Sequence, residues 1–316
     1  MKYLIIYIII LLILFYPNII NIPYKKCKYQ HIESFNIKNF ESNNTFSKIF
    51  NPSIVWNNNN IIICARESNN SLKTIFNWLV HKFILNTYSN IIIQDGNKNI
   101  FFEDKLLEDP RIIKFKNYYL ISVVKYSSPK NIFPLLIILN KKFQIINKLK
   151  YIFSEKRNKI EKNWCLFIHE NEIYLHTDTY PKWIIYKLIF RKNYVFCLKF
   201  KEYSLDLNIK YFLRCSTSWK EFNKEYYIVG LHSKIFFVPF CDIKSLLVLV
   251  DKKTFKPLYI TNQLCLCYNS HERIQFLSGL EVDNEYVYLS FGVGDYKYEI
   301  HKVNKKIILK HLIEIK

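Results

Sequence analysis

Charged and polar side chains occupy equivalent places in five stretches of this chain that are otherwise apolar. Each stretch opens with polar residues, continues into an apolar run, turns over two to four polar residues and returns in a second apolar run. Such side chains, gathered in one pocket, bind polar or anionic ligands, whereas spread apart they only form turns and cap strands. Their repetition favours a shared functional site, and the candidate residues are Arg66, Asp109, Arg111, Lys162, Asn163, His176, Arg214, His232 and Asp295.

The spacing of the five stretches indicates the fold that would bring these residues together. The stretches start at residues 51, 108, 161, 214 and 278, so they are 57, 53, 53 and 64 residues apart. Runs of Ile, Val, Tyr, Phe and Leu between Asn, Lys, Asp and Pro turns predict strands, with further strands at 132–139 and 237–250. A period in the fifties suits one four-stranded blade with its loops. We therefore predict an all-β fold, a five-bladed β-propeller whose innermost strands begin around one funnel.

The N-terminus carries a different signal. Residues 3–16 are apolar without interruption and lie between Lys2 and Pro17. We predict a signal anchor or transmembrane helix over 1–24, a linker over 25–47 and the propeller domain over 48–316. A cleaved signal peptide and a buried strand remain as alternatives. The expected localisation is single-pass and membrane-anchored, with the orientation open because Lys25, Lys26 and Lys28 outweigh Lys2.

Composition limits the partners. The net charge is +20, from 46 Lys and Arg against 26 Asp and Glu, which suits an acidic partner unless the basic residues are simply spread over the surface. Zinc-finger, RNP-type and helix-turn-helix patterns are not visible, so nucleic acid is not expected. Of the 8 cysteines, Cys265 and Cys267 form a C-x-C without the further ligands of a zinc site, and no metal or cofactor is expected. Cys64, Cys165 and Cys197 lie in apolar runs and are predicted to be buried.

Short motifs that open the repeats resemble a known family. They are Asn51-Pro52-Ser53 with Ala65-Arg66, Glu108-Asp109-Pro110-Arg111, Glu161-Lys162-Asn163-Trp164, and Ser278-Gly279-Leu280 with Phe291-Gly292-Val293-Gly294-Asp295. In this order they resemble the five-bladed β-propeller family of β-mannoside phosphorylases and hydrolases, to which the β-1,2-mannosyltransferases are related. The resemblance implies a glycan-active enzyme, a glycosyltransferase or glycoside phosphorylase acting on β-mannosides. Its partners would be a carbohydrate and a sugar phosphate or inorganic phosphate.

The resemblance also implies roles for individual residues. Asp109 would be the general acid, and a phosphorylase needs no second carboxylate because phosphate is already a nucleophile. Arg111 would clamp Asp109 or the sugar, and Asp295 would bind sugar hydroxyls. The residues expected to hold the anion or sugar hydroxyls are Arg66, Lys162 and His232, and those that either stack on a sugar ring or pack in the core are Trp164 and Trp219.

The chain departs from that family in two places. The last motif continues as Tyr296-Lys297-Tyr298, and paired arginines that would hold phosphate are not found between residues 150 and 191. One alternative is therefore a non-catalytic carbohydrate-binding propeller, against which the presence of Asp109 speaks. Another is a propeller glycosidase, which would need three carboxylates; Asp109, Asp295 and Asp178 could be offered.

Overall fold

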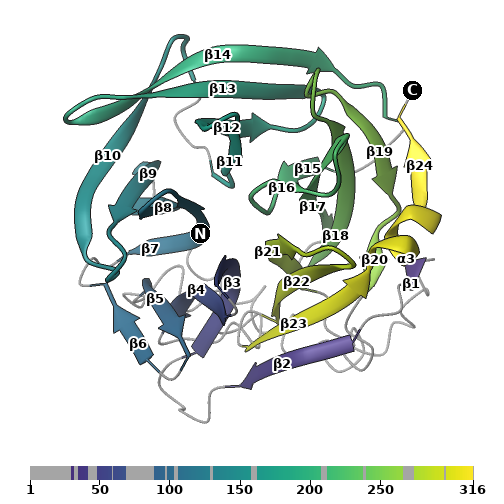
Figure 1. Ribbon diagram of the computed structural model, residues 1–316, viewed down its shortest axis with the longest axis horizontal. Coiled ribbons are helices and arrows are strands. Elements are labelled where there is room, and N and C mark those ends of the chain that lie inside the picture. Colours follow the sequence, from purple (N-terminus) through teal and green to yellow (C-terminus); the bar gives the residue numbers. More distant parts are fainter. Residues whose placement is uncertain are drawn as a thin grey trace, which may run out of the picture. The chain divides into compact units, whose positions relative to one another are not determined.

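The structure is a computed structural model that describes residues 30–31, 35–41, 48–58, 60–68, 89–96, 98–102, 106–128, 131–157, 162–207, 212–237, 240–265, 274–294 and 297–315. The chain divides into two compact units, Met1–Gln30 and His31–Lys316. Only Gln30 of the first unit is described, as part of β1 (Gln30–His31). The described residues of the second unit are mostly in strands, which form a nearly closed, barrel-like arrangement (Figure 1).

Twelve consecutive strands of this unit form three antiparallel sets of four, and the order within each set follows the chain. The first set is β3 (Lys48–Asn57), β4 (Asn60–Ser68), β5 (Ser89–Asp95) and β6 (Lys98–Phe101). The second is β7 (Leu107–Phe115), β8 (Tyr118–Ser128), β9 (Asn131–Leu139) and β10 (Ile145–Phe153). The third is β11 (Cys165–His169), β12 (Glu172–Asp178), β13 (Lys182–Phe190) and β14 (Tyr194–Ser204). Parallel pairing of β10 with β14 joins the second set to the third.

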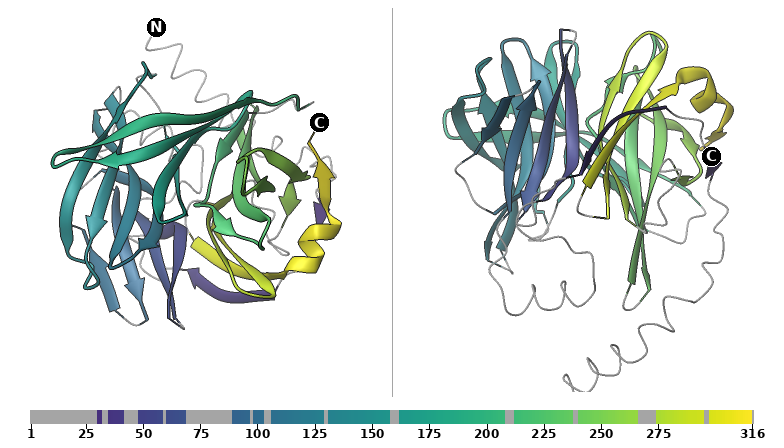
Figure 2. Two further views of the ribbon diagram at one scale, coloured as in Figure 1. Left: turned by 45° about the horizontal axis from the view of Figure 1, so that its top comes forward. Right: turned by 90° about the horizontal axis from the view of Figure 1, so that it is seen from below.

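The two remaining sets are less regular. The fourth contains β15 (Phe212–Cys215), β16 (Lys220–Glu221), β17 (Tyr226–Phe237), β18 (Phe240–Asp251), β19 (Pro257–Thr261), β20 (Leu264–Cys265) and β24 (Leu312–Glu314). The hairpin of β17 and β18 extends beyond its neighbours (Figure 2). The fifth contains β21 (Gln275–Val282), β22 (Tyr286–Val293) and β23 (Lys297–Asn304), which helix α3 (Lys305–Lys310) follows. Its fourth strand, β2 (Phe35–Glu41), comes from the segment predicted to be a linker and pairs with β23.

The hydrophobic core shows how the five sets follow one another. Among the described residues it consists of five clusters, and each cluster joins two sets. Two members, one from each set, represent each cluster. The clusters join the first and second sets (Cys64, Ile121), the second and third (Leu120, Leu166), the third and fourth (Phe167, Val248), the fourth and fifth (Leu247, Leu289), and the fifth and first (Ile300, Ile63). The last cluster returns to the first set, so the sets surround a common centre, with β3, β7, β11, β16 and β21 nearest to it (Figure 1).

Burial on both faces explains the strand sequences. Ile62, Ile63, Cys64 and Ala65 are consecutive in β4 and all are buried, as expected for a strand covered on both sides. Each predicted stretch contains a paired hairpin, in the order β3–β4, β7–β8, β11–β12, β15–β17 and β21–β22. The strands expected at 132–139 and 237–250 are confirmed as β9 and β18, although residue 237 itself ends β17. Burial of the three predicted cysteines is confirmed as well, and all are free thiols.

The expectation of a membrane anchor is corrected. A spanning helix needs about 20 apolar residues, and α3, which follows β23, has 6. Across the residues that the structure describes, no helix is long and apolar enough to cross a membrane. The single-pass membrane localisation, with its signal-anchor and transmembrane assignments, is therefore not supported, and the segment 1–24 lies outside the described residues.

A buried ion pair in the fifth set predicts sensitivity to acid. The Glu299 carboxylate lies 2.9 Å from His301 Nε2 and 3.2 Å from Lys297 Nζ, and the hydrogen bond from His301, then the charge of Lys297, lower the pKa of Glu299 to about 2 despite burial. A carboxylate with a lowered pKa in the folded state stabilises the fold above its unfolded pKa, and that stability is lost as the pH falls. We expect Glu299→Gln to cost on the order of 2 kcal/mol at pH 6 and only a small part of that near pH 2.

Urea unfolding of both proteins from pH 6 to pH 2 measures this difference. The exposed Glu314 supplies the control, since Glu314→Gln should run parallel to the wild type at every pH. A Glu299→Gln curve that is equally parallel would contradict the prediction.

Candidate functional site

Three inner strands are irregular at the same place, where each begins. The pairing register shifts between Phe50 and Ser53 in β3, between Glu108 and Arg111 in β7, and between Leu277 and Gly279 in β21. Such bulges aim a side chain away from the regular pleat and are common beside functional sites. The sites of irregularity are thus the beginnings of three predicted motifs, and they meet because β3 contacts both β7 and β21.

The bulges of β3 and β7 hold an unusual backbone conformation. Asn51 has φ +50° and Asp109 has φ +48°, and each precedes a proline. Asn and Asp tolerate this left-handed region better than other non-glycine residues. Asn163, just before β11, has φ +67°. Strained residues of this kind cluster at functional sites, so a polar residue at the start of three neighbouring inner strands is held in a strained but defined orientation.

Asn51 fixes the carboxylate of Asp109. Asn51 Nδ2 donates a hydrogen bond of 3.1 Å to Asp109 Oδ1, and both side chains are buried. A Cβ atom on Gly292 would lie 1.9 Å from Asn51 Oδ1, so glycine is required where β22 passes this amide. The last predicted motif, which contains Gly292, therefore supports the first two across the site.

Asp109 is a buried anion among cations. Burial acts to raise its pKa, but the charges of Lys162, Arg66 and Arg111 and the hydrogen bond from Asn51 outweigh burial and leave the pKa below its ordinary value. The carboxyl group is therefore ionised at neutral pH among these side chains. An ionised carboxylate can accept a proton, and it becomes a proton donor only when its surroundings become more negative.

Arg66 is held rigidly beside this carboxylate. Its Nε donates to Ser89 Oγ at 2.9 Å and its Nη2 forms an ion pair with Glu108. Its guanidinium lies over the ring of Phe50, 5.0 Å from the centroid. Glu108, the residue before Asp109, is thus occupied in positioning a cation.

Arg111 is buried with unused donors. Its side chain is 1% exposed, Nη1 donates to Pro110 O at 2.8 Å, and the guanidinium lies over Phe276 at 5.3 Å. Its Nε and Nη2 have no hydrogen-bond partner within the described structure. A buried charged donor without a partner is costly, so these two nitrogens are poised for a ligand. Arg111, which was expected to clamp Asp109, acts on it through its charge and lowers the pKa of that carboxyl group.

Lys162 and Asn163 approach the site from the third set. Lys162 is the largest of the charges that lower the pKa of Asp109. Asn163 is buried, and its Oδ1 has no hydrogen-bond partner among the described residues; the same holds for Asn51 Oδ1. Unused acceptors on two amides and unused donors on Arg111 thus lie at the starts of the inner strands β3, β7 and β11.

His232 and Arg214 complete the cluster from the fourth set. The two residues lie opposite each other in the β15–β17 pairing. His232 is buried, whereas Arg214 is exposed. His232 Nδ1 lies 2.7 Å from Ser216 Oγ, and its ring meets Phe276 edge to face at 4.8 Å. Burial, followed by the charges of Arg111 and Arg214, lowers the pKa of His232 well below its usual range. This imidazole is therefore neutral.

His176 lies in the core instead. It is fully buried against Trp183 at 4.0 Å between ring centroids. Trp219 Nε1 donates to its Nδ1 at 3.2 Å, and its Nε2 lies 2.9 Å from Asp178 O. Burial lowers the pKa of His176 to about 3. Both ring nitrogens are occupied, so His176 serves packing here.

The two tryptophans are also buried. Trp219 stacks on Phe167 with centroids 4.1 Å apart, and Trp164 meets Phe153 edge to face at 5.0 Å. These contacts belong to core packing. Asp295, by contrast, lies outside the described residues.

The structure thus brings six of the nine candidates close enough to act on one another through charge, and contacts add four further residues. The six are Arg66, Asp109, Arg111, Lys162, Arg214 and His232, which act on one another through charge, and Asn163 precedes the same inner strand as Lys162. The additions are Asn51, Glu108, Ser216 and Phe276. The parallel between Asn51-Pro52 and Asp109-Pro110 could have identified Asn51, whereas Ser216 and Phe276 have no sequence signal. Metal ligands do not gather in groups of three or more in the described part of the chain.

Comparisons with known proteins define a class of fold. No family model and no curated protein sequence matches the chain. Solved structures with similar folds include mannoside phosphorylases and glycoside hydrolases, so the predicted resemblance is confirmed for the fold.

Three of these structures can be described individually. The β-1,2-mannobiose phosphorylase from Listeria innocua, in complex with β-1,2-mannobiose, has a TM-score of 0.57 and 10% identity over 86% of this chain and 94% of its own. A mannose phosphorylase from Leishmania mexicana, in complex with phosphate, has 0.57 and 11% over 91% and 92%. A glycosyl hydrolase from Bacteroides ovatus has 0.57 and 12% over 87% and 91%. At these identities the likeness concerns the fold.

Proposed function

We propose that this chain is a glycan-active enzyme that carries out mannosyl transfer or phosphorolysis of β-mannosides, with Asp109 as its single general acid and base. Its catalytic domain would be a five-bladed β-propeller over 48–316, completed by β2. The five strand sets around a common centre support the propeller, and the fold of the mannoside phosphorylases supports the substrate class. The observation that carries the proposal is one buried carboxylate that accepts a hydrogen bond from Asn51 and whose pKa is lowered by three nearby cations.

The charges of the site favour phosphate over water as the second reactant. An inverting hydrolase needs a second carboxylate about 6.5–9.5 Å from the first to activate water. Glu108, the nearest carboxylate along the chain, is committed to Arg66. Phosphate needs no activating base, and basic side chains bind it well. Lys162, Arg66 and Arg111 supply that charge.

The ionisation of Asp109 suits transfer from a sugar phosphate. As the acceptor hydroxyl attacks C1 of the donor sugar, its proton passes to the Asp109 carboxylate, the C1–O bond to phosphate breaks, and phosphate leaves with the electron pair. In phosphorolysis the same steps run backwards. Bound phosphate then offsets the positive charge of Lys162 and Arg66, which raises the pKa of Asp109 and lets it donate a proton to the glycosidic oxygen.

The unused hydrogen-bonding groups suit a sugar. A sugar hydroxyl donates one hydrogen bond and accepts others, so it can satisfy an amide oxygen and a guanidinium N–H at once. Asn51 Oδ1 and Asn163 Oδ1 supply the acceptors, and Arg111 supplies the donors. A buried site built this way rejects analogues that lack the hydroxyl.

A donor screen on the full-length protein tests the proposal. Mannose 1-phosphate and GDP-mannose are offered with simple mannosides, and released phosphate or GDP is measured; the reverse assay offers β-mannosides with inorganic phosphate. We expect turnover that depends on mannose 1-phosphate in one direction and on phosphate in the other.

Two results would replace the proposal. Free mannose released without phosphate would indicate a glycosidase, although Asp178, its candidate third carboxylate, is paired with Arg157 at 2.7 Å. Binding of mannosides without turnover of any donor would indicate a carbohydrate-binding module.

A further inference from the structure

The segment that carries Lys162 and Asn163 is held at both of its described ends by a group of side chains outside the site. It joins β10 to β11, and Arg157 precedes these two residues. We propose that Arg157 is a positioning residue, which anchors this segment so that Lys162 and Asn163 stay beside Asp109. This proposal rests on the proposed function only for what the site does, since the contacts of Arg157 do not depend on the reaction that is catalysed.

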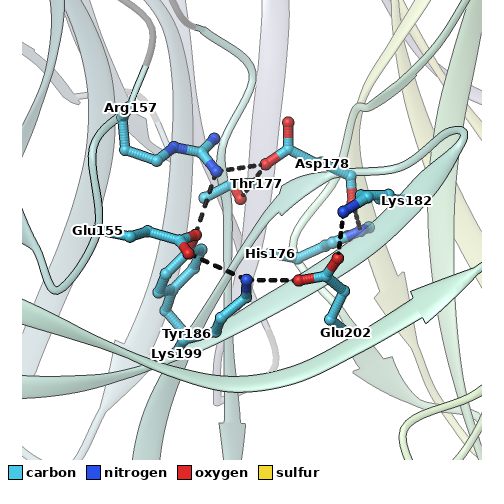
Figure 3. A network of polar contacts seen from close by, with 9 residues as sticks. All are labelled: Glu155, Arg157, His176, Thr177, Asp178, Lys182, Tyr186, Lys199 and Glu202. Atoms are coloured by element: carbon cyan, nitrogen blue, oxygen red, sulfur yellow. Dashed lines mark hydrogen bonds and ion pairs between the residues drawn. The ribbon is translucent and has the colours of Figure 1, made fainter.

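Arg157 is bound through its edge and through its face. Its Nη1 lies 2.7 Å from Asp178 Oδ2 and donates to Tyr186 OH at 3.2 Å (Figure 3). Its guanidinium lies over the rings of Phe153 at 5.2 Å, Tyr186 at 5.6 Å and Trp164 at 6.0 Å. Its side chain is only 14% exposed, although Asp178 is 41% exposed, so the stacking on the aromatic rings is the better shielded of its contacts.

Trp164 lies at the other end of the segment and packs into the same group of aromatic side chains. It meets Phe153 and Tyr151 edge to face at 5.0 and 5.3 Å, and it directly follows Asn163. Arg157, which precedes Lys162 in the chain, and Trp164, which directly follows Asn163, therefore meet on one aromatic group. That arrangement limits how far Lys162 can move relative to Asp109.

The partners of Arg157 are themselves fixed. Asp178 accepts a hydrogen bond from Thr177 Oγ1 at 2.7 Å, and Tyr186 donates to Glu155. Further ion pairs extend the network from Glu155 to β14 and β13 (Figure 3) through Glu155–Lys199, Lys199–Glu202 and Lys182–Glu202. The anchor is thus tied to the third strand set, whose inner strand β11 begins directly after Trp164.

An arginine is required for this role. A planar guanidinium stacks on aromatic faces while its edge binds a carboxylate, and a lysine ammonium cannot do both. Arg157→Lys would keep the positive charge and lose the anchor. Loss of charge and loss of position are therefore separable by substitution.

The test follows the ionisation of Asp109 by NMR titration of the ¹³C-labelled, full-length protein without substrate, with the signal assigned through Asp109→Asn. Lys162 is the strongest charge lowering the pKa of Asp109, so Lys162→Met should raise that pKa. We expect Arg157→Met and Arg157→Lys to raise it as well. In the Lys162→Met background, Arg157→Met should cause no further change, because its effect passes through Lys162.

The control is Arg191→Met, at an exposed arginine after β13, which should leave the Asp109 pKa unchanged. Two results would overturn the proposal. One is an unchanged Asp109 pKa in Arg157→Met. The other is a rise in that pKa that is absent in Arg157→Lys and still occurs in the Lys162→Met background, because Arg157 would then act on Asp109 directly through its charge. If Arg157→Met does not fold by near-ultraviolet circular dichroism, Asp178→Asn replaces it, with a smaller rise expected and an unchanged pKa as the contrary result. If no sugar donor were turned over, the proposed function would be wrong, but the pKa changes of Asp109 would still test the role of Arg157. The two proposals can therefore be contradicted independently.

Discussion

Asp109→Asn should lower turnover by about a thousandfold or more while the fold and sugar binding persist. Proton transfer by a positioned side chain contributes about 10²–10⁴-fold to a rate, and an amide can neither accept nor donate the proton at this place. Asparagine keeps the size of the side chain and still accepts the hydrogen bond from Asn51. It also tolerates the left-handed backbone that Asp109 adopts, so the substitution removes chemistry with little disturbance of structure.

The measurement is kcat with the donor identified in the screen, together with calorimetric binding of a β-mannoside. Asp283, an exposed carboxylate at the β21–β22 turn, provides the control, and Asp283→Asn should leave kcat unchanged. Unaltered turnover in Asp109→Asn would remove the acid–base role. Lost binding together with a lower melting temperature would show instead that Asp109 holds the site together.

Trp219→Ala should destabilise the protein by about 3–5 kcal/mol, the usual range for a large aromatic residue removed from a core. Trp219 is 3% exposed and lies parallel to Phe167, with an interplanar angle of 9°. Alanine leaves a cavity between the third and fourth strand sets and removes the hydrogen bond to His176. Trp219→Phe should cost less, because it keeps most of the packing and loses chiefly that hydrogen bond.

Urea unfolding measures both variants. Trp56, a partly buried tryptophan that meets Tyr288 edge to face at 5.1 Å, serves for comparison, and Trp56→Ala should cost less than Trp219→Ala. An unchanged free energy of unfolding in Trp219→Ala, with weaker mannoside binding, would instead support a sugar-stacking role for this residue.

The strand pairs of the inner hairpins could be predicted from local sequence because their determinants are local. The β11–β12 turn, for example, places Glu170 and Asn171 at φ +48° and +59°, the conformation of a two-residue hairpin turn. The strand β2 could not be predicted in this way. It pairs with β23, more than 250 residues away along the chain, and nothing in residues 35–41 records that distant edge.

Two histidines separate what the sequence determined from what only the tertiary structure decided. His176 and His232 both follow a leucine near the end of the second strand of a repeat, and the sequence alone marks them equally as candidates. In the structure His232 lies beside Phe276 and Arg111 from other strand sets, whereas His176 lies beneath Trp183 and Trp219. The sequence determined the repeats, the pattern of polar and apolar residues in each strand and the motif that contains Asp109, since these depend on residues close together in the chain. Closure of the strand sets decided which polar side chains share a site, because it sets which residues from other sets surround each one.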